Sequence, residues 1–353
     1  MTGKFCHKVK AIQEDNIKMK RVILAGTGSG NPRKKVTNDD LTAFLDTSDE
    51  WIRTRTGIST RYLATDETVV DLCVKAAEDA LNTADMKAEE LELIIVASVT
   101  PDKIVPNTSS EVQAALGAKK AICFDQNAAC SGFLFALSTA SAYISSGVVK
   151  NALVIGGEIL SKIMDWSDRS TCVLFGDGAG AAILKAGEDQ DTIGGDKDKK
   201  GIIGFKLGTD GSKGQVLLLE NRPVINPYTA PAPEPIHYPY VHMEGQAVFK
   251  FAVSTVPRSI KELLEETGTD IREVSCFVLH QANLRIISAV AKRLKVSDDK
   301  FMVNMDKYGN TSAASIPLAL DEALKTGKAK EGDLLVIAGF GGGLTWGSML
   351  IRL

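Results

Sequence analysis

Leu93-Ile94-Ile95-Val96 and Cys276-Phe277-Val278-Leu279 are two continuous apolar runs that begin 183 residues apart. A run of this length without polar alternation is typical of a strand that is buried on both faces of a sheet. A second pair, Leu153-Val154-Ile155-Gly156 and Leu335-Val336-Ile337-Ala338, repeats the relation at an offset of 182 residues. Because strand and helix patterns alternate around both pairs, the sequence predicts two copies of one α/β unit.

The composition limits the classes of protein to which the chain can belong. It has 353 residues, of which 44% are apolar and 24% are charged, enough to bury a large core. The formal net charge of −3 argues against a general nucleic-acid-binding protein. Since no apolar run approaches the length of a membrane span, we expect no membrane insertion. Six cysteines without Cys-x-x-Cys spacing and only four histidines favour a cytoplasmic protein with reduced thiols and without a metal site.

The repeat suggests where the chain divides. Residues 1–18 are polar and without a clear period, so we interpret them as an N-terminal extension or a remnant of cloning. Residues 19–190 then form an N-terminal half and residues 191–353 a C-terminal half, with a charged, Gly-rich junction at 189–200. The segment 223–239 contains six prolines, which predicts an irregular surface loop or cap.

Local patterns predict the remaining elements. Hydrophobic periodicity indicates helices at 69–81, 107–116, 133–147, 245–260 and 283–294. Gly26-Thr27-Gly28-Ser29-Gly30 follows the first strand and suggests a dinucleotide-binding loop. The third glycine of that motif would fall at Asn31, so the match fails and we predict a turn leading out of the strand.

Cys130 lies between small residues, after the apolar run 121–124 and before a long helical pattern. At the start of a helix, unpaired backbone N–H groups and the positive end of the helix dipole favour a thiolate. A buried structural cysteine is the alternative interpretation. In the register of the repeat Cys130 falls opposite Ser312, so we expect two helix N-termini to converge where ligands gather.

Three further features accompany Cys130. His280 directly follows the strand 276–279, and Asn310 lies in a Gly-Asn-Thr-Ser turn. Either can be structural, but Cys, His and Asn together make a nucleophilic set. Gly339-Phe340-Gly341-Gly342-Gly343 is either a tight connection between two core strands or a source of backbone N–H groups for an oxyanion hole.

Six ordered motifs resemble β-ketoacyl-acyl-carrier-protein synthase III, one of the thiolase-like condensing enzymes. The motifs are Asp49–Ile58, Ala128–Phe133, Phe175–Gly180, His280–Asn283, Gly309–Ala314 and Gly341–Gly343. The resemblance runs from about Lys20 to Leu353. It implies an α/β, thiolase-like fold with two pseudo-duplicated halves in a layered α-β-α-β-α architecture. Asn310 stands where chain-elongating relatives have a second histidine, which points to the initiating, acyl-CoA-primed type.

The resemblance implies a reaction as well. It is the decarboxylative Claisen condensation of an acyl-CoA primer with malonyl-acyl carrier protein, which gives a 3-oxoacyl-acyl carrier protein and initiates fatty acid synthesis. Cys130 carries the acyl group, and the backbone N–H groups of Cys130 and Gly342 form the oxyanion hole. His280 and Asn310 donate hydrogen bonds where enolate charge develops, so neither metal nor cofactor is expected.

Binding residues follow from the same resemblance. The residues expected to bind CoA are Trp51, Arg55, Thr56, Arg169, Phe249, Ala282 and Asn283. Those expected to face the acidic carrier protein are Lys250, Arg285, Lys292 and Arg293, although the last two could also belong to an ordinary solvated helix face. Val105 and Phe175 are expected to line the primer pocket. Val105 stands where several relatives have Phe that reaches across a homodimer interface, so we predict primers longer or more branched than acetyl.

Three other functions fit parts of the pattern. A cysteine hydrolase also uses Cys, His and Asn in this chain order. A related thiolase-fold enzyme could make a polyketide starter, an ester or a lactone. A non-catalytic acyl-CoA-binding protein would lack a reason to keep all three residue types.

Overall fold

Two five-stranded sheets form the frame of the protein. The computed structural model describes residues 19–187, 199–228 and 236–353, so the predicted extension 1–18 and most of the predicted junction 189–200 lie outside the described residues. The first sheet contains β1 (Val22–Gly30), β4 (Leu93–Ala97), β5 (Ile122–Gln126), β6 (Asn151–Glu158) and β7 (Gly178–Ala186). The second contains β8 (Gly201–Thr209), β11 (Cys276–Leu279), β12 (Phe301–Met302), β13 (Leu334–Gly341) and β14 (Thr345–Arg352).

The two sheets share one topology. Their strand orders are β5-β4-β6-β7-β1 and β12-β11-β13-β14-β8. In each sheet the first three strands are parallel, and the last two pairings are antiparallel. The strands β4 and β11, and likewise β6 and β13, begin 183 residues apart. The predicted duplication is therefore confirmed strand by strand.

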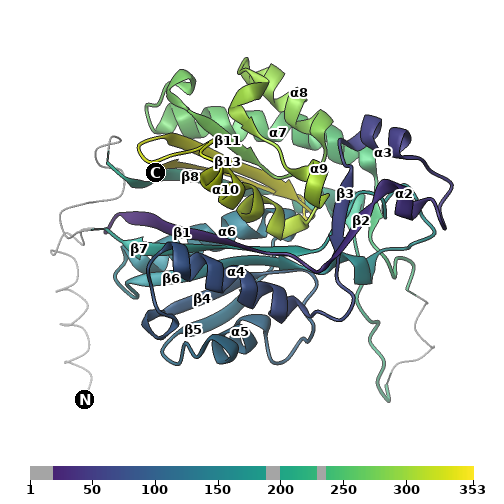
Figure 1. Cartoon of the computed structure of the whole chain (residues 1–353), viewed down its shortest axis with the longest axis horizontal. Helices are drawn as coiled ribbons and strands as arrows, with labels where there is room; N and C mark the ends of the chain where they lie inside the picture. The colour runs from purple at the N-terminus through teal and green to yellow at the C-terminus, as the bar shows by residue number, and fades with distance from the viewer. Residues whose placement is uncertain (1–18, 188–198, 229–235) are drawn as a thin grey trace.

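Helices complete five layers (Figure 1). The outer face of the first sheet carries α4 (Val69–Thr83) and α5 (Thr108–Leu116), and that of the second carries α7 (Gly245–Glu266) and α8 (Leu284–Leu294). Between the sheets lie α6 (Gly132–Ser145) and α10 (Ser315–Lys325), which contact strands of both sheets. The order of layers is α-β-α-β-α, as predicted. The five predicted helices are all present, with ends that differ by a few residues.

The central helices explain where the core lies. An outer helix buries one face, but α6 buries ten of its 14 residues because sheets cover it from both sides. Its Phe133, Leu134 and Leu137 join the apolar cluster that fills the space between the sheets. Separate apolar clusters lie under α4 and under α7 and α8. The site described below opens at the N-terminal ends of the two central helices.

The glycine-rich segment after the first strand is not a turn. It is the second half of β1, and its glycines alternate at Gly26, Gly28 and Gly30. A methyl group at any of them would come within 2.2–2.6 Å of backbone oxygens of α4. Glycine is thus needed because the helix packs directly on the strand, and the prediction of a turn was wrong.

Shorter elements connect the layers. The remaining helices and strands are β2 (Lys34–Thr37), α2 (Asn38–Leu41), α3 (Asp49–Thr56), β3 (Thr60–Leu63), β9 (Leu217–Leu218), β10 (His242–Met243) and α9 (Met305–Tyr308). The short 3₁₀ helices are η1 (Ala88–Glu90), η2 (Ala129–Ser131), η3 (Leu160–Ile163), η4 (Gly211–Val216), η5 (Ile271–Glu273), η6 (Asp298–Lys300) and η7 (Ser312–Ala314). The Pro-rich segment has neither helix nor strand in its described parts, 223–228 and 236–239. In the described part of the chain, none of the helices is long and apolar enough to cross a membrane.

Candidate active site

Two equivalent turns meet at the centre of the site. Cys130 lies in η2, the 3₁₀ turn that leads into α6, and η7 leads into α10 in the same way. The two turns contact each other, and each contains a non-glycine residue with positive φ, 46° at Ala129 and 48° at Ser312. These bounds correspond at an offset of 183, so Ala129 is the counterpart of Ser312 and Cys130 that of Ala313. The predicted pairing of Cys130 with Ser312 was one residue out, because the element bounds follow the larger offset.

His280 follows β11 and is buried. Its Nδ1 lies 2.5 Å from Oγ of Ser315, which also accepts a weak hydrogen bond of 3.4 Å from the backbone N–H of Gln281. The serine proton is then left to donate to Nδ1, which places the imidazole proton on Nε2. Burial lowers the pKa of His280 to about 3, so the ring is neutral at physiological pH. A neutral ring with its proton on Nε2 is a hydrogen-bond donor.

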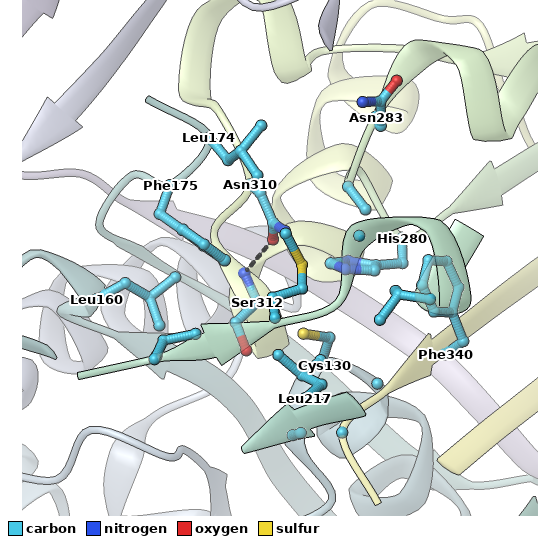
Figure 2. A pocket seen from close by; sticks show the side chains of 18 of the residues that line it. Cys130, Leu160, Leu174, Phe175, Leu217, His280, Asn283, Asn310, Ser312 and Phe340 are labelled. Carbon is cyan, nitrogen blue, oxygen red and sulfur yellow. Dashed lines mark hydrogen bonds between the residues drawn. The ribbon is translucent and has the colours of Figure 1, made fainter. Parts of the chain in front are cut away.

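Asn310 is held by its own turn. The backbone N–H of Ser312 donates to Oδ1 of Asn310 over 2.9 Å, as the dashed line in Figure 2 shows. The amide Nδ2 is therefore left as the donor group. Backbone hydrogen bonds from Asn310 N to Leu174 O (2.8 Å) and from Gly176 N to Asn310 O (3.0 Å) fix the turn beside Phe175.

The glycine loop serves both of its predicted roles. It joins β13 to β14 as a tight hairpin, and Gly341 and Gly342 line the cavity beside Cys130. A methyl group on Gly341 would lie 2.6 Å from the backbone nitrogen of Cys130, so only glycine allows this approach. Thr345 fixes the loop because its hydroxyl donates to Gly342 O (3.0 Å) and Ala128 O (3.1 Å).

The thiol of Cys130 is protonated at physiological pH. Burial raises its pKa to about 11, and the charge of Glu158 adds to this. A hydrogen bond with Ser312 and the backbone N–H of Cys130 itself act in the opposite direction. Because burial outweighs these two effects, the expectation that the helix start would favour a thiolate was wrong for the free protein.

One cavity of about 360 Å³ joins these groups (Figure 2). Of the predicted site residues, it is lined by Cys130, His280, Asn310, Gly342, Phe175, Trp51, Arg55, Thr56, Phe249, Ala282 and Asn283. Most other lining residues are apolar, among them Leu160, Ile163, Leu174, Leu217 and Met243. The polar groups lie together around the thiol, so the cavity suits a long apolar ligand whose reactive end meets Cys130.

The mouth of the cavity lies between α3 and α8. The guanidinium of Arg55 is 4.5 Å, and that of Arg169 5.3 Å, from the ring centroid of Trp51. Asn283 ties the helices together because its amide donates to Arg55 O (3.0 Å) and its Oδ1 accepts from Arg285 N (2.9 Å). Its polar atoms are thus committed to backbone. The hydroxyl of Thr56 is similarly used within its helix, accepting from Ile58 N and donating to Ile52 O.

The other predicted residues lie outside the cavity. Arg285 is exposed and donates to Thr54 O over 2.9 Å, which braces the mouth. Lys292 and Arg293 are exposed in the last turn of α8, about 10 Å further along the helix. Lys250 is exposed on α7. Val105 is 85% exposed beside Ile104, which is 84% exposed.

Sequence reasoning missed three groups of the site. Ser315 orients His280, Ser312 bonds the thiol, and Glu158 lies buried where its charge acts on Cys130. Glu158 could have been noticed, since it is a lone carboxylate ending an apolar strand. Ser315 could not, because its partner is 35 residues away in sequence. Among residues 19–187, 199–228 and 236–353, no group of three or more His, Cys, Asp or Glu could hold a metal ion.

Known proteins resemble the chain closely. Family models described as 3-oxoacyl-[acyl-carrier-protein (ACP)] synthase III match residues 124–211 and, for the C-terminal part, residues 264–353. The β-ketoacyl-[acyl-carrier-protein] synthase III of Clostridium acetobutylicum is 48% identical over 334 residues, covering 95% of this chain and 99% of that protein.

Solved structures agree. The crystal structure of 3-oxoacyl-[acyl-carrier-protein] synthase III from Aquifex aeolicus has a TM-score of 0.85 and 46% identity, covering 94% of this chain and 100% of that one. A priming β-ketosynthase from a polyketide biosynthetic pathway has a TM-score of 0.86 and 34% identity, covering 95% and 97%. The predicted fold and family are thereby confirmed, and with them a condensing acyltransferase. The chain belongs to the β-ketoacyl-[acyl-carrier-protein] synthase III family of thiolase-like condensing enzymes.

Proposed function

We propose that this chain condenses an acyl-CoA primer with malonyl-acyl carrier protein and so initiates fatty acid synthesis, with Cys130 as the acyl-carrying nucleophile. The observation that carries the proposal is the position of one thiol and two hydrogen-bond donors, His280 and Asn310, beside a single apolar cavity. Family membership favours this reaction over a cysteine hydrolase.

Acyl transfer is the first step. The sulfur of Cys130 attacks the thioester carbonyl, and the backbone N–H groups of Cys130 and Gly342 stabilise the oxyanion. Glycine at 341 supports this role because it lets the loop approach the cysteine amide. The CoA thiolate then leaves, and the acyl group remains on Cys130.

Condensation is the second step. Loss of CO2 from the malonyl thioester leaves an enolate, whose negative charge builds up on the thioester oxygen. His280 Nε2–H and Asn310 Nδ2–H donate to that oxygen, and both donors are fixed by their own hydrogen bonds before substrate arrives. The enolate carbon attacks the acyl-cysteine, and the 3-oxoacyl-acyl carrier protein is released. This route needs neither metal nor cofactor.

CoA and the carrier protein share the mouth of the cavity in this proposal. The Trp51 ring between Arg55 and Arg169 suits an adenine with its phosphates, while Thr56, Phe249, Ala282 and Asn283 form the walls. Lys250, Arg285, Lys292 and Arg293 offer positive charge to the acidic carrier. We also propose a cytoplasmic location, with halves at 19–190 and 191–353.

The primer pocket and the homodimer are linked proposals. Phe175 lines the cavity, whereas Val105 and Ile104 form an exposed apolar pair, which supports a subunit contact there. A valine reaching the partner's pocket leaves more room than a phenylalanine. We therefore expect isobutyryl-CoA and hexanoyl-CoA to be used as well as acetyl-CoA.

The test is a condensation assay across these primers with malonyl-acyl carrier protein, combined with mass spectrometry of the protein after acyl-CoA alone. An acyl adduct on Cys130 followed by 3-oxoacyl product supports the proposal. Product from acetyl-CoA only would contradict the pocket hypothesis, and an adduct without any condensation would contradict the function.

A polyketide starter synthase is the second candidate. It is favoured by the similarity to a priming β-ketosynthase at 34% identity over 95% of the chain. The two candidates share their chemistry and differ in the carrier protein that they accept. Comparing the turnover with a fatty acid and a polyketide carrier protein from the same organism separates them.

A further inference from the structure

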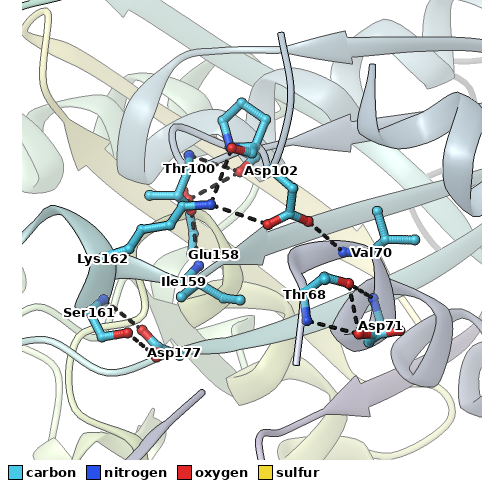
Figure 3. A network of polar contacts seen from close by, with 12 residues as sticks. Thr68, Val70, Asp71, Thr100, Asp102, Glu158, Ile159, Ser161, Lys162 and Asp177 are labelled. Atoms are coloured by element: carbon cyan, nitrogen blue, oxygen red, sulfur yellow. Dashed lines mark hydrogen bonds and ion pairs between the residues drawn. The ribbon is translucent and has the colours of Figure 1, made fainter. Parts of the chain in front are cut away.

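A buried carboxylate lies behind the catalytic cysteine. Glu158 is the last residue of β6 and has no exposed surface. It accepts hydrogen bonds from Ser98 Oγ (3.2 Å), Val99 N (3.1 Å) and Thr100 Oγ1 (2.5 Å), all in the segment after β4. Figure 3 shows it beside Thr100. The ion pairs found among the described residues do not include Glu158, so its partners are dipoles only.

Ser312 connects this carboxylate to the thiol. Its hydroxyl bonds the side chain of Glu158 and also the side chain of Cys130. The positive φ of Ser312 holds the residue between the two groups. Cys130, Ser312 and Glu158 thus form one hydrogen-bonded chain that leads away from the cavity.

The proposed acyl transfer needs a proton acceptor. The thiol starts protonated, and its S–H bond must break as the S–C bond forms. His280 has its Nδ1 taken by Ser315 and presents a donor, and Asn310 likewise presents its amide. Neither of these two groups is a base towards the cavity.

We propose that Glu158 accepts the proton of Cys130 through Ser312 during acyl transfer and returns it when the thiol is released. The Cys130 proton moves to Ser312 Oγ while the Ser312 hydroxyl proton moves to the carboxylate, so that the acyl-enzyme forms with Glu158 neutral. The departing CoA thiolate takes a proton from solvent. In condensation, the C–S bond of the acyl-cysteine breaks and the sulfur recovers its proton from Glu158 by the reverse path. One acyl-CoA, one malonyl thioester and one solvent proton thus give product, CoA thiol and CO2.

The surroundings of Glu158 suit this role. Burial raises its pKa to about 7, near the pH at which a general base works best. The titratable groups that its charge affects are Cys130 and, on α4, Cys73, whose pKa is also raised. Asp102 and Asp125 add negative charge from flanking loops, and Asp102 is paired with Lys162 at 3.3 Å.

The other half of the molecule supplies the design of a variant. Ala129, the counterpart of Ser312, adopts nearly the same positive φ, which shows that alanine fits such a turn. Ser312→Ala therefore removes the relay hydroxyl and is expected to keep the backbone. Glu158→Gln removes the titrating group, and Glu158→Asp retains it. Ser161→Ala is the matched control, since Ser161 bonds another buried carboxylate, Asp177, over 2.6 Å.

The experiment measures the rate of Cys130 alkylation by iodoacetamide against pH in the free protein, and the kcat and KM of acyl transfer from acyl-CoA. We expect an inflection near pH 7 in the wild type, Glu158→Asp and Ser161→Ala. It should be lost in Ser312→Ala and Glu158→Gln, together with a roughly 10²-fold fall in kcat at unchanged KM.

An inflection that persists in Ser312→Ala, or that the wild type lacks, would overturn the relay. If Glu158→Gln does not fold, Ser312→Ala decides alone. The proposal rests on the proposed function for its acyl-transfer step, but the alkylation profile needs no substrate. Failure of condensation with every primer, beside an intact inflection, would therefore count against the function and not against the relay.

Discussion

The two halves of the molecule share a backbone and divide the chemistry. Asn127 and Asn310 are counterparts, and each accepts a hydrogen bond from the N–H two residues later, over 3.1 and 2.9 Å. Asn127 is exposed, whereas Asn310 is buried at the cavity. The duplicated turn therefore fixes geometry in both halves, and only its surroundings make one copy part of the site.

The same asymmetry holds at the other paired positions. Cys130 has Ala313 as its counterpart, and His280, directly after β11, corresponds to Ala97 at the end of β4. Glu158 corresponds to Gly341, so a carboxylate stands behind one turn and a close backbone approach stands in front of it. Each half thus contributes what the other lacks. The comparison predicts which substitutions matter and supplies their controls.

Cys130→Ala gives the largest effect. Ala313 already occupies the equivalent position, so the variant is expected to fold. Without a nucleophile, acylation and condensation should fall by about 10⁴-fold or more, measured by adduct mass and product formation. Cys123→Ala, which removes a thiol outside the cavity, is the control and should keep wild-type activity. Substantial condensation by Cys130→Ala would contradict the mechanism.

Asn310→Ala against Asn127→Ala tests the comparison directly. Both variants remove the same local hydrogen bond, which costs about 1 kcal/mol of folding free energy. Only Asn310→Ala removes a donor to the enolate oxygen, so its condensation rate should fall about 10²–10³-fold. Rates measured with pre-acylated protein isolate this step. Equal losses in the two variants would mean that both asparagines act through structure alone.

The buried carboxylate makes the N-terminal half sensitive to pH. The pKa of Glu158 rises from 4.5 to about 7 on folding, so the folded state binds the extra proton. Its stabilising contribution is complete below pH 4.5 and is lost as pH rises through 7, a change of about 3 kcal/mol. Urea unfolding at pH 4.5 and 8 should show this loss in the wild type and not in Glu158→Gln. A pH-independent difference between the two proteins would contradict it.

The outer helices provide the smallest test. α8 carries Arg285, Lys292 and Arg293, whereas its counterpart α5 carries no basic residue. Replacing Lys292 and Arg293 by glutamate should raise the KM for the carrier protein several-fold at low salt and less at high salt. Lys75→Glu, on the outer helix α4, is the control. An unchanged KM would assign the two residues to the solvated surface.

Much of this arrangement could be predicted from the sequence, because it depends on local patterns that occur twice. Buried strands such as 93–97 and 276–279 lack polar residues, so their pairing at a constant offset could be found without coordinates. The identity of the catalytic set followed from motifs around Cys130, His280 and Asn310. These features are written in short stretches of chain.

What could not be predicted depends on neighbours that are distant in sequence. The glycines of β1 were interpreted as a turn because their reason is the helix α4 packed against them. The thiolate at Cys130 was expected from the helix start, but burial by the second half decides its charge. The committed polar atoms of Asn283 likewise depend on a carbonyl 228 residues away.

The meeting of η2 and η7 has a consequence for biosynthesis. A chain synthesised as far as Ala186 already contains all five strands of the first sheet and Cys130, but lacks His280 and Asn310. Because proteins emerge from the ribosome N-terminal end first, the nucleophile exists well before its partners. A nascent or truncated chain can bury its thiol yet cannot condense, so catalysis itself certifies that both halves have been made and docked.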